Sequence, residues 1–154
     1  MNQRRRLLAF AGLGLTGLFA SKAESAPVER KHLPVYAKDY QTSTGLYPGD
    51  GTVVTVRAKG VWGIWGSDRR CSAAGDAEAH ENEHGHWPVE GVPEGTLLIW
   101  FGNQVHYWKW QMLAPNDYQV SFTFQGNDKL QLGPNDNHLE DNANGGYLDV
   151  YVLY

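Results

Sequence analysis

Short apolar or alternating segments, separated by turn-forming residues, make up most of the chain after its first two dozen residues. TVVTVRAKGVW is rich in β-branched residues, which is typical of a strand, and TLLIWF (96–101) is apolar throughout, as expected of a strand buried on both faces. In the final segment, Leu148, Val150 and Val152 fall on one face of a strand. No long helical period occurs here, so the pattern predicts an all-β protein, a small antiparallel β-sandwich.

Two segments near the middle of this region also predict strands. VHYWKWQM (105–112) alternates, which predicts one strand with His106, Trp108, Trp110 and Met112 on one face. SFTF (121–124) predicts a strand with both phenylalanines directed inward. Trp100, within TLLIWF, is expected to belong to the core of the sandwich.

The first 23 residues predict an export signal, with a basic start, a 14-residue apolar run and small residues before an expected cleavage after Ala23. The apolar run is shorter than the roughly 20 residues of a membrane-spanning helix. QRRRLL, with Arg4 and Arg5 as the pair, resembles a twin-arginine signal, although three arginines also form an ordinary basic start. Both export routes stay open, and the expected location is periplasmic or secreted.

The remaining chain divides into residues 24–44, expected to form a leader or an edge strand, and residues 45–154, expected to form a single β-sandwich domain. Cleavage would remove four basic residues and change the net charge from -4 to -8, and such acidity argues against a nucleic-acid partner. Cys71 is the only cysteine, so no disulfide can form within the chain. The sequence leaves open whether Cys71 is free or bridges two chains, and whether the protein is a homo-oligomer.

NDNHLEDNANGG (135–146) gathers carboxylate and amide side chains before the final strand, and no Lys or Arg follows Lys129 to neutralise them. Calcium takes six to eight oxygen ligands and tolerates irregular geometry, which suits such a loop. The side chains that we expect to bind calcium are Asp136, Asp141 and Asn142, with the backbone carbonyl of Leu139 or Glu140 as a further ligand. The alternative is a solvated loop, because Asn, Asp and Gly are also ordinary turn formers.

Five pieces occur in order between residues 46 and 154: YPGDGTVVTVRAKGVWGIWG, a GD followed by a histidine-bearing loop, GTLLIWFGN, LAPND, and the final ND, DN and glycine cluster. Together they resemble the calcium-dependent, galactose-binding bacterial lectins of the PA-IL type. The resemblance implies a jelly-roll β-sandwich with one calcium site. It also implies that two hydroxyls of a galactose-type sugar complete the coordination of the calcium ion.

The resemblance further implies ligands for the metal. Asp136 matches the family's bidentate calcium aspartate, and Glu140 falls where a backbone carbonyl ligand is expected. Asp141-Asn142 is the preferred match for the late pair, with Asn144 as the alternative if the gap in the loop falls earlier. The resemblance also implies that a backbone carbonyl at the end of the first long strand, that of Trp65 or Ile64, binds the calcium ion. The implied metal ligands are thus Asp136, Glu140, Asp141, Asn142, Asn144 and Trp65.

The long connection from Ser67 to Val92 is rich in Gly, His and acidic residues, and its length points to a functional or mobile segment. In the lectin family a His and a nearby Gln contact the sugar, and AHENEHGH offers comparable groups. Trp87 is expected to face the ligand because sugars pack on aromatic rings, with burial under the long loop as the alternative. The expected sugar-binding residues are His80, Asn82, His84, Trp87, Asp136 and Asn142.

Two other functions compete with a lectin. His80, Glu81 and His84 match the HExxH pattern of zinc hydrolases, but the glycines on either side leave too few residues for a stable helix. A structural β-sandwich subunit, whose calcium only stabilises the fold, is the third reading. The leading prediction is a non-enzymatic, exported, calcium-dependent carbohydrate-binding protein without a membrane span.

Overall fold

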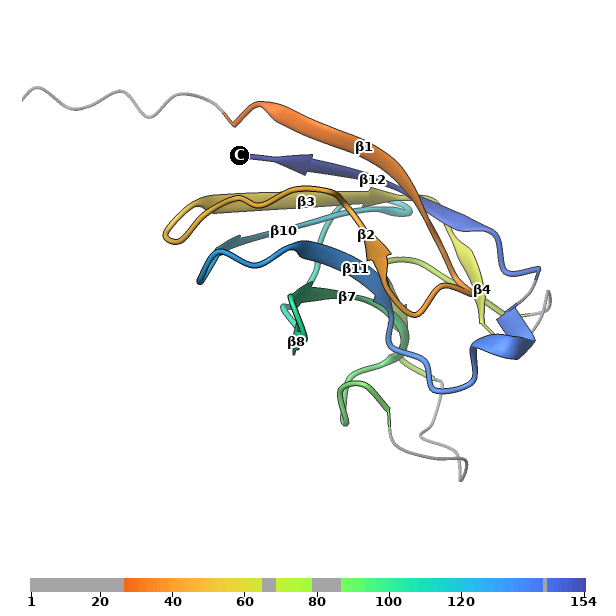
Figure 1. Cartoon of the computed structure of the whole chain (residues 1–154). Helices are drawn as coiled ribbons and strands as arrows, with labels where there is room; N and C mark the ends of the chain where they lie inside the picture. Colours follow the sequence, from red (N-terminus) through yellow and green to blue (C-terminus); the bar gives the residue numbers. More distant parts are fainter. Residues whose placement is uncertain (1–26, 65–68, 79–86, 143) are drawn as a thin grey trace, which may run out of the picture.

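The computed structural model describes residues 27–64, 69–78, 87–142 and 144–154, and its strands pack as an antiparallel β-sandwich (Figure 1). One five-stranded sheet has the order β1-β12-β3-β10-β9, and a second is built from β2, β11, β7, β6 and β8. The all-β prediction is confirmed, and the jelly-roll connectivity stays a prediction. The export signal lies outside the described residues, within which no helix is long and apolar enough to cross a membrane.

The first sheet is made of β1 (Glu29–Tyr36), β12 (Tyr147–Leu153), β3 (Val53–Lys59), β10 (Asp117–Thr123) and β9 (Gln111–Ala114). The second is made of β2 (Thr42–Ser43), β11 (Leu130–Pro134), β7 (Glu94–Phe101), β6 (Ala74–Asp76) and β8 (Gln104–His106). A short pair, β4 (Trp62–Ile64) and β5 (Arg69–Cys71), lies beside them, and one 3-10 turn, η1, covers Leu139–Asn142.

The hydrophobic core lies between the two sheets and follows the predicted periodicities. In β12, Leu148, Val150 and Val152 are fully buried, while the residues between them are partly exposed. Every residue of β7 is buried, as its unbroken apolar run predicted, and Trp100 is 2% exposed. Phe122 is also buried, at the inward face of β10. Alternating and continuous apolar segments therefore have the places in the sandwich that their patterns require.

The prediction of one continuous strand over residues 105–112 is wrong. The segment ends β8 at His106, crosses from one sheet to the other, and resumes as β9 at Gln111. Trp110 is buried and its indole N–H donates to the carbonyl oxygen of Leu97 at 3.0 Å, whereas Met112 is 62% exposed. The two side chains do not share a buried face. The indole of Trp110 packs in the core where the chain passes from one sheet to the other, whereas Met112 belongs to an edge strand.

Cys71 is a free, buried cysteine at the end of β5. Burial raises the pKa of its thiol to about 12, and its sulfur lies 3.6 Å from the carbonyl oxygen of Gly95. The thiolate is the reactive form, so native Cys71 is expected to resist iodoacetamide at mildly alkaline pH. Mass spectrometry should detect the adduct only after unfolding in urea, and equal labelling of native and unfolded protein would contradict the burial of this thiol.

The connection from β11 to β12 joins the two sheets across one end of the sandwich, where Figure 1 shows η1 beside β4. Backbone hydrogen bonds attach this connection to its surroundings: Gly63 N–H donates to Gly145, and Ala37 N–H donates to Gly146 at 3.1 Å. A Cβ at position 145 would lie 2.3 Å from the carbonyl oxygen of Gly63, so only glycine allows this approach. The oxygen-rich segment is therefore held against the sheet ends.

Candidate functional site

Asp136 is the centre of the candidate site, and its carboxylate is 2% exposed at the end of β11. One carboxylate oxygen accepts the backbone N–H of His138 at 2.7 Å, and the other accepts the side-chain amide of Asn142. The same amide of Asn142, itself 1% exposed, donates to the carbonyl oxygen of Ala37 at 3.2 Å. Asp136 and Asn142, six positions apart, are therefore brought together and tied to the end of β1.

Asp141 brings a second carboxylate to the same turn. One of its oxygens, Oδ1, is buried and has no hydrogen-bond partner within the described residues, and Oδ2 lies 3.7 Å from Nδ1 of His138. Burial raises the pKa of the Asp141 carboxyl, and the negative charge of Asp136 raises it further. An oxygen without a partner, next to a second negative charge, is the environment that a bound cation would relieve.

Most of the potential metal-binding atoms at this turn are oxygens. Among the described residues, no three His, Cys, Asp or Glu side chains are grouped as a metal site. The oxygens of this turn belong to the carboxylates of Asp136 and Asp141, the amide of Asn142 and the backbone carbonyls of η1. Such mixed oxygen donors are typical of calcium, whereas zinc prefers imidazole and thiolate.

The structure describes only some of the other sequence-predicted residues. The side chains of Glu140 and Asn144 are exposed. The asparagine whose side chain hydrogen-bonds to Asp136 is Asn142 and not Asn144. The predicted residues Trp65, His80, Asn82 and His84 lie outside the described residues. The zinc-hydrolase triplet, which includes Glu81, lies outside them as well.

Asn135, the first asparagine of the cluster, has a role that the sequence did not reveal. It is fully buried, and its side chain forms three hydrogen bonds with the segment that follows Trp87. Oδ1 accepts the N–H of Val89 at 3.0 Å, while Nδ2 donates to the carbonyl oxygens of Val89 at 3.1 Å and Val92 at 3.0 Å. Asn135 therefore fixes the end of the long connection beside Asp136.

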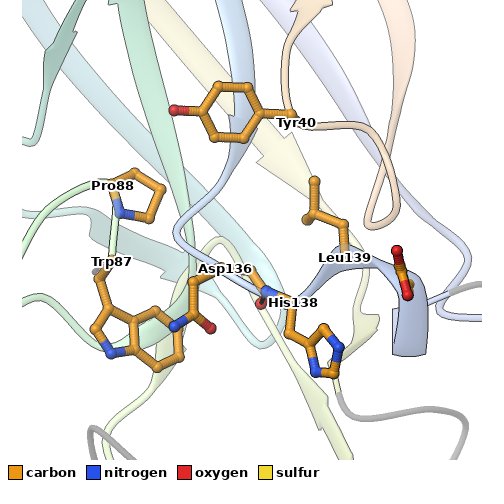
Figure 2. Close-up of a pocket in the computed structure, with 8 residues that line it drawn as sticks. Tyr40, Trp87, Pro88, Asp136, His138 and Leu139 are labelled. Carbon is orange, nitrogen blue, oxygen red and sulfur yellow. Dashed lines mark hydrogen bonds between the residues drawn. The ribbon is translucent and has the colours of Figure 1, made fainter. Parts of the chain in front are cut away.

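A pocket of about 580 Å³ opens over this turn (Figure 2). Trp87 and Pro88 form part of its wall, Asp136 also lines it, and Tyr40 lies above them at the top of the view. Trp87 is half-buried, and its ring belongs to the lining of the pocket. The described residues that line it are Tyr40, Trp87, Pro88, Asp136, Asn137, His138, Leu139 and Glu140.

Neither Tyr40 nor His138 was expected in the site. Tyr40 lies almost a hundred residues before Asp136, in a segment expected to be a leader or an edge strand, so no local pattern connects the two. His138 lies inside the oxygen-rich cluster, but the acidic residues around it predicted a calcium site, in which an imidazole is not an expected ligand. Comparison of the chain with protein-family models, curated proteins and solved structures finds no match.

Proposed function

We propose that this protein binds carbohydrate with the help of calcium, and that galactose-type glycans are its ligands. The observation that carries the proposal is the lining of one pocket, to which both the half-buried Trp87 and the buried Asp136 belong. Sugars present an apolar C–H face and polar hydroxyls at once. A site for them therefore needs an aromatic ring next to strong oxygen-binding groups.

The calcium ligands in this proposal come from one short segment. Asp136 and Asp141 supply carboxylate oxygens, Asn142 supplies its amide oxygen, and η1 supplies a backbone carbonyl at Leu139 or Glu140. A bound calcium ion would neutralise the two carboxylates and offer remaining coordination positions to sugar hydroxyls. The buried, partnerless oxygen of Asp141 supports this assignment, because a folded protein seldom leaves such an atom without a compensating contact.

The sugar would rest against Trp87, with its hydroxyls directed toward the oxygen-rich turn. Asn135 holds Val89 by two hydrogen bonds, so Pro88 is next to a fixed point and Trp87 is two residues from it. A wall that is fixed before binding lowers the entropic cost of association. The roles proposed for His80, Asn82 and His84 rest on the family resemblance alone.

A second candidate function, a structural domain in which calcium only stabilises the fold, has one observation in its favour. Asn142 connects Asp136 with Ala37 at the end of β1, so an ion at this turn would brace the first and last strands of the sheet. Such a protein would gain thermal stability from calcium but would bind no glycan. The two functions therefore differ in sugar binding and not in calcium binding.

A panel of immobilised glycans, probed with the mature protein, separates these functions. We expect binding to galactose-ended glycans that EDTA abolishes and added calcium restores. Calorimetric titration of calcium, with and without galactose, should show each ligand tightening the binding of the other. Glycan binding that EDTA leaves unchanged would contradict a role for calcium, and a calcium-stabilised protein that binds no glycan would favour the structural function.

Asp141→Asn is expected to stabilise the calcium-free protein at neutral pH while reducing its stabilisation by calcium. The raised pKa of Asp141 means that the fold disfavours its ionised form, so this carboxyl favours folding at acid pH and loses that contribution as the pH rises through its folded pKa. The gain should stay below about 1 kcal/mol, because solvent screens a side chain that is 36% exposed.

Melting curves of the wild type and Asp141→Asn, each with EDTA and with excess calcium, measure both effects. At pH values below the usual range of a carboxyl group the two calcium-free proteins should have the same stability. A variant that melts earlier than the wild type in EDTA, yet gains as much from calcium, would show that Asp141 is not a ligand.

A further inference from the structure

Tyr40 gives the pocket a second aromatic wall that the proposed monosaccharide site does not use. Its side chain is 50% exposed, yet its ring packs against the buried ring of Trp100, with centroids 5.7 Å apart and planes tilted by 57°. This contact fixes one edge of the tyrosine and leaves the remainder open to the pocket. Aromatic residues that are half exposed and yet held in place are typical of binding surfaces.

The backbone at Tyr40 is also fixed, because it lies directly on β11. A Cβ at Gly133 would fall 2.1 Å from the carbonyl oxygen of Tyr40, so the two backbones meet without room for a side chain. The neighbouring Gln41 accepts a hydrogen bond from the side chain of Gln131 at 2.9 Å, again on β11. Tyr40 is therefore a rigid part of the pocket.

Both aromatic walls are attached to the same short stretch of chain. The backbone of Tyr40 packs directly on Gly133. Asn135, two residues later, holds the segment that contains Trp87 by hydrogen bonds. Figure 2 shows the rings of Tyr40 and Trp87 well separated, with Pro88 between them on one side and Leu139 on the other. The pocket thus has two separate stacking positions whose spacing is set by the end of β11.

The size of the pocket exceeds that of one sugar ring. A hexose has about twelve non-hydrogen atoms and would fill about 360 Å³ even at the volume that water takes per molecule in the liquid. The open pocket has a volume of about 580 Å³, which leaves room beyond a single ring at Trp87. A second sugar ring, joined to the first, is a ligand group that fits beside a tyrosine.

The charge of the pocket limits the kind of sugar. Asp136 and Glu140 line it, the charge of Asp141 interacts with that of Asp136, and none of the described lining residues is Lys or Arg. Even one divalent cation would leave this group of three carboxylates with a net negative charge. Uronic and sialic acids, which carry their own carboxylates, would be repelled there.

We propose that the pocket recognises two consecutive residues of a neutral glycan, the first at Trp87 and Asp136 and the second against Tyr40. This inference rests on the proposed carbohydrate function and adds to it the length and charge of the ligand. Tyr40 then determines preference for an oligosaccharide over a monosaccharide. The calcium ligands determine whether any sugar binds at all.

Calorimetric titration of the mature protein in excess calcium, with D-galactose, lactose, melibiose and digalacturonate as probes, tests the inference. We expect at least one of the two neutral disaccharides to bind about three- to tenfold more tightly than galactose, as one extra ring contact would provide. Digalacturonate should bind more weakly than galactose. Tyr40→Ala should remove the advantage of the disaccharide while leaving the affinity for galactose within about twofold.

Tyr47→Ala is the matched control, because Tyr47 is 63% exposed and does not line the pocket. If galactose binds but neither neutral disaccharide binds more tightly, or if Tyr40→Ala behaves like Tyr47→Ala, the two-residue site is wrong while the carbohydrate function stands. Binding of digalacturonate as tight as that of the neutral disaccharides would overturn the charge argument. If none of the probes binds in calcium, both proposals fail together.

Discussion

Replacing Asp136 with asparagine is expected to weaken calcium binding by about 100-fold or more and to abolish calcium-dependent sugar binding. Asparagine keeps the shape of the side chain but removes the negative charge and one of the two equivalent oxygens. Because Asp136 is 2% exposed, water cannot substitute for the lost carboxylate oxygen. The carboxylate of Asp141 is less buried, since its side chain is 36% exposed.

The same substitution should cost only a modest amount of stability. The new side chain can still accept the N–H of His138, but its amide would face the amide of Asn142, so one buried hydrogen bond is lost. Such a loss typically costs about 1–2 kcal/mol. The protein should therefore remain folded by circular dichroism, and its melting temperature should no longer respond to calcium.

Asp128→Asn is the appropriate control, because it removes the same charge from an exposed position on the connection between β10 and β11. Calorimetry should give this control the calcium and galactose affinities of the wild type. If Asp136→Asn folds and binds calcium within a few-fold of the wild type, the metal site lies elsewhere. The proposed lectin function would then lose its structural support.

The sequence predicted the core strands well because their patterns are local. The alternation in β12 and the unbroken apolar run of β7 each fix which faces are buried, whatever the rest of the chain does. The alternation at residues 105–112 misled, because a segment that crosses between two sheets can alternate as well as a strand does. Only the pairing partners of β8 and β9 distinguish the two cases.

The candidate site likewise contains some residues that the local sequence predicted and others that only tertiary contacts bring together. Asp136, Asp141 and Asn142 lie within seven consecutive residues, so composition alone marked them as a group. Tyr40 and Trp87 reach the same pocket from distant parts of the chain, through backbone contacts at Gly133 and side-chain hydrogen bonds of Asn135. No periodicity or spacing encodes such contacts, because they arise from tertiary packing.

Asn135 shows why the composition of a loop does not reveal the role of each member. Asn, Asp and Gly gather in turns and in calcium loops for different reasons, and the sequence cannot separate a metal ligand from a structural amide. The structure does so, because both polar atoms of the Asn135 side chain are already engaged with backbone groups of Val89 and Val92. Asn135 therefore holds the wall of the pocket and leaves metal binding to its neighbours.

Asn135→Ala is expected to lower the free energy of unfolding by about 2–4 kcal/mol, because it removes three hydrogen bonds and leaves partly buried backbone groups without these partners. Urea unfolding should show a lower midpoint with an unchanged slope. Asn127→Ala, at an exposed position, is the control and should change stability by less than about 0.5 kcal/mol.

The same variant should also weaken sugar binding more than calcium binding. Without Asn135, the segment from Trp87 to Val92 loses its attachment to β11, so the indole must be ordered when the ligand binds. Asp136 and Asn142 remain bonded to each other and to Ala37, so the calcium ligands stay together. Calorimetry on the folded variant should therefore show a reduced affinity for galactose at a nearly unchanged affinity for calcium. Equal losses of both affinities would contradict this division of roles between the wall and the metal site.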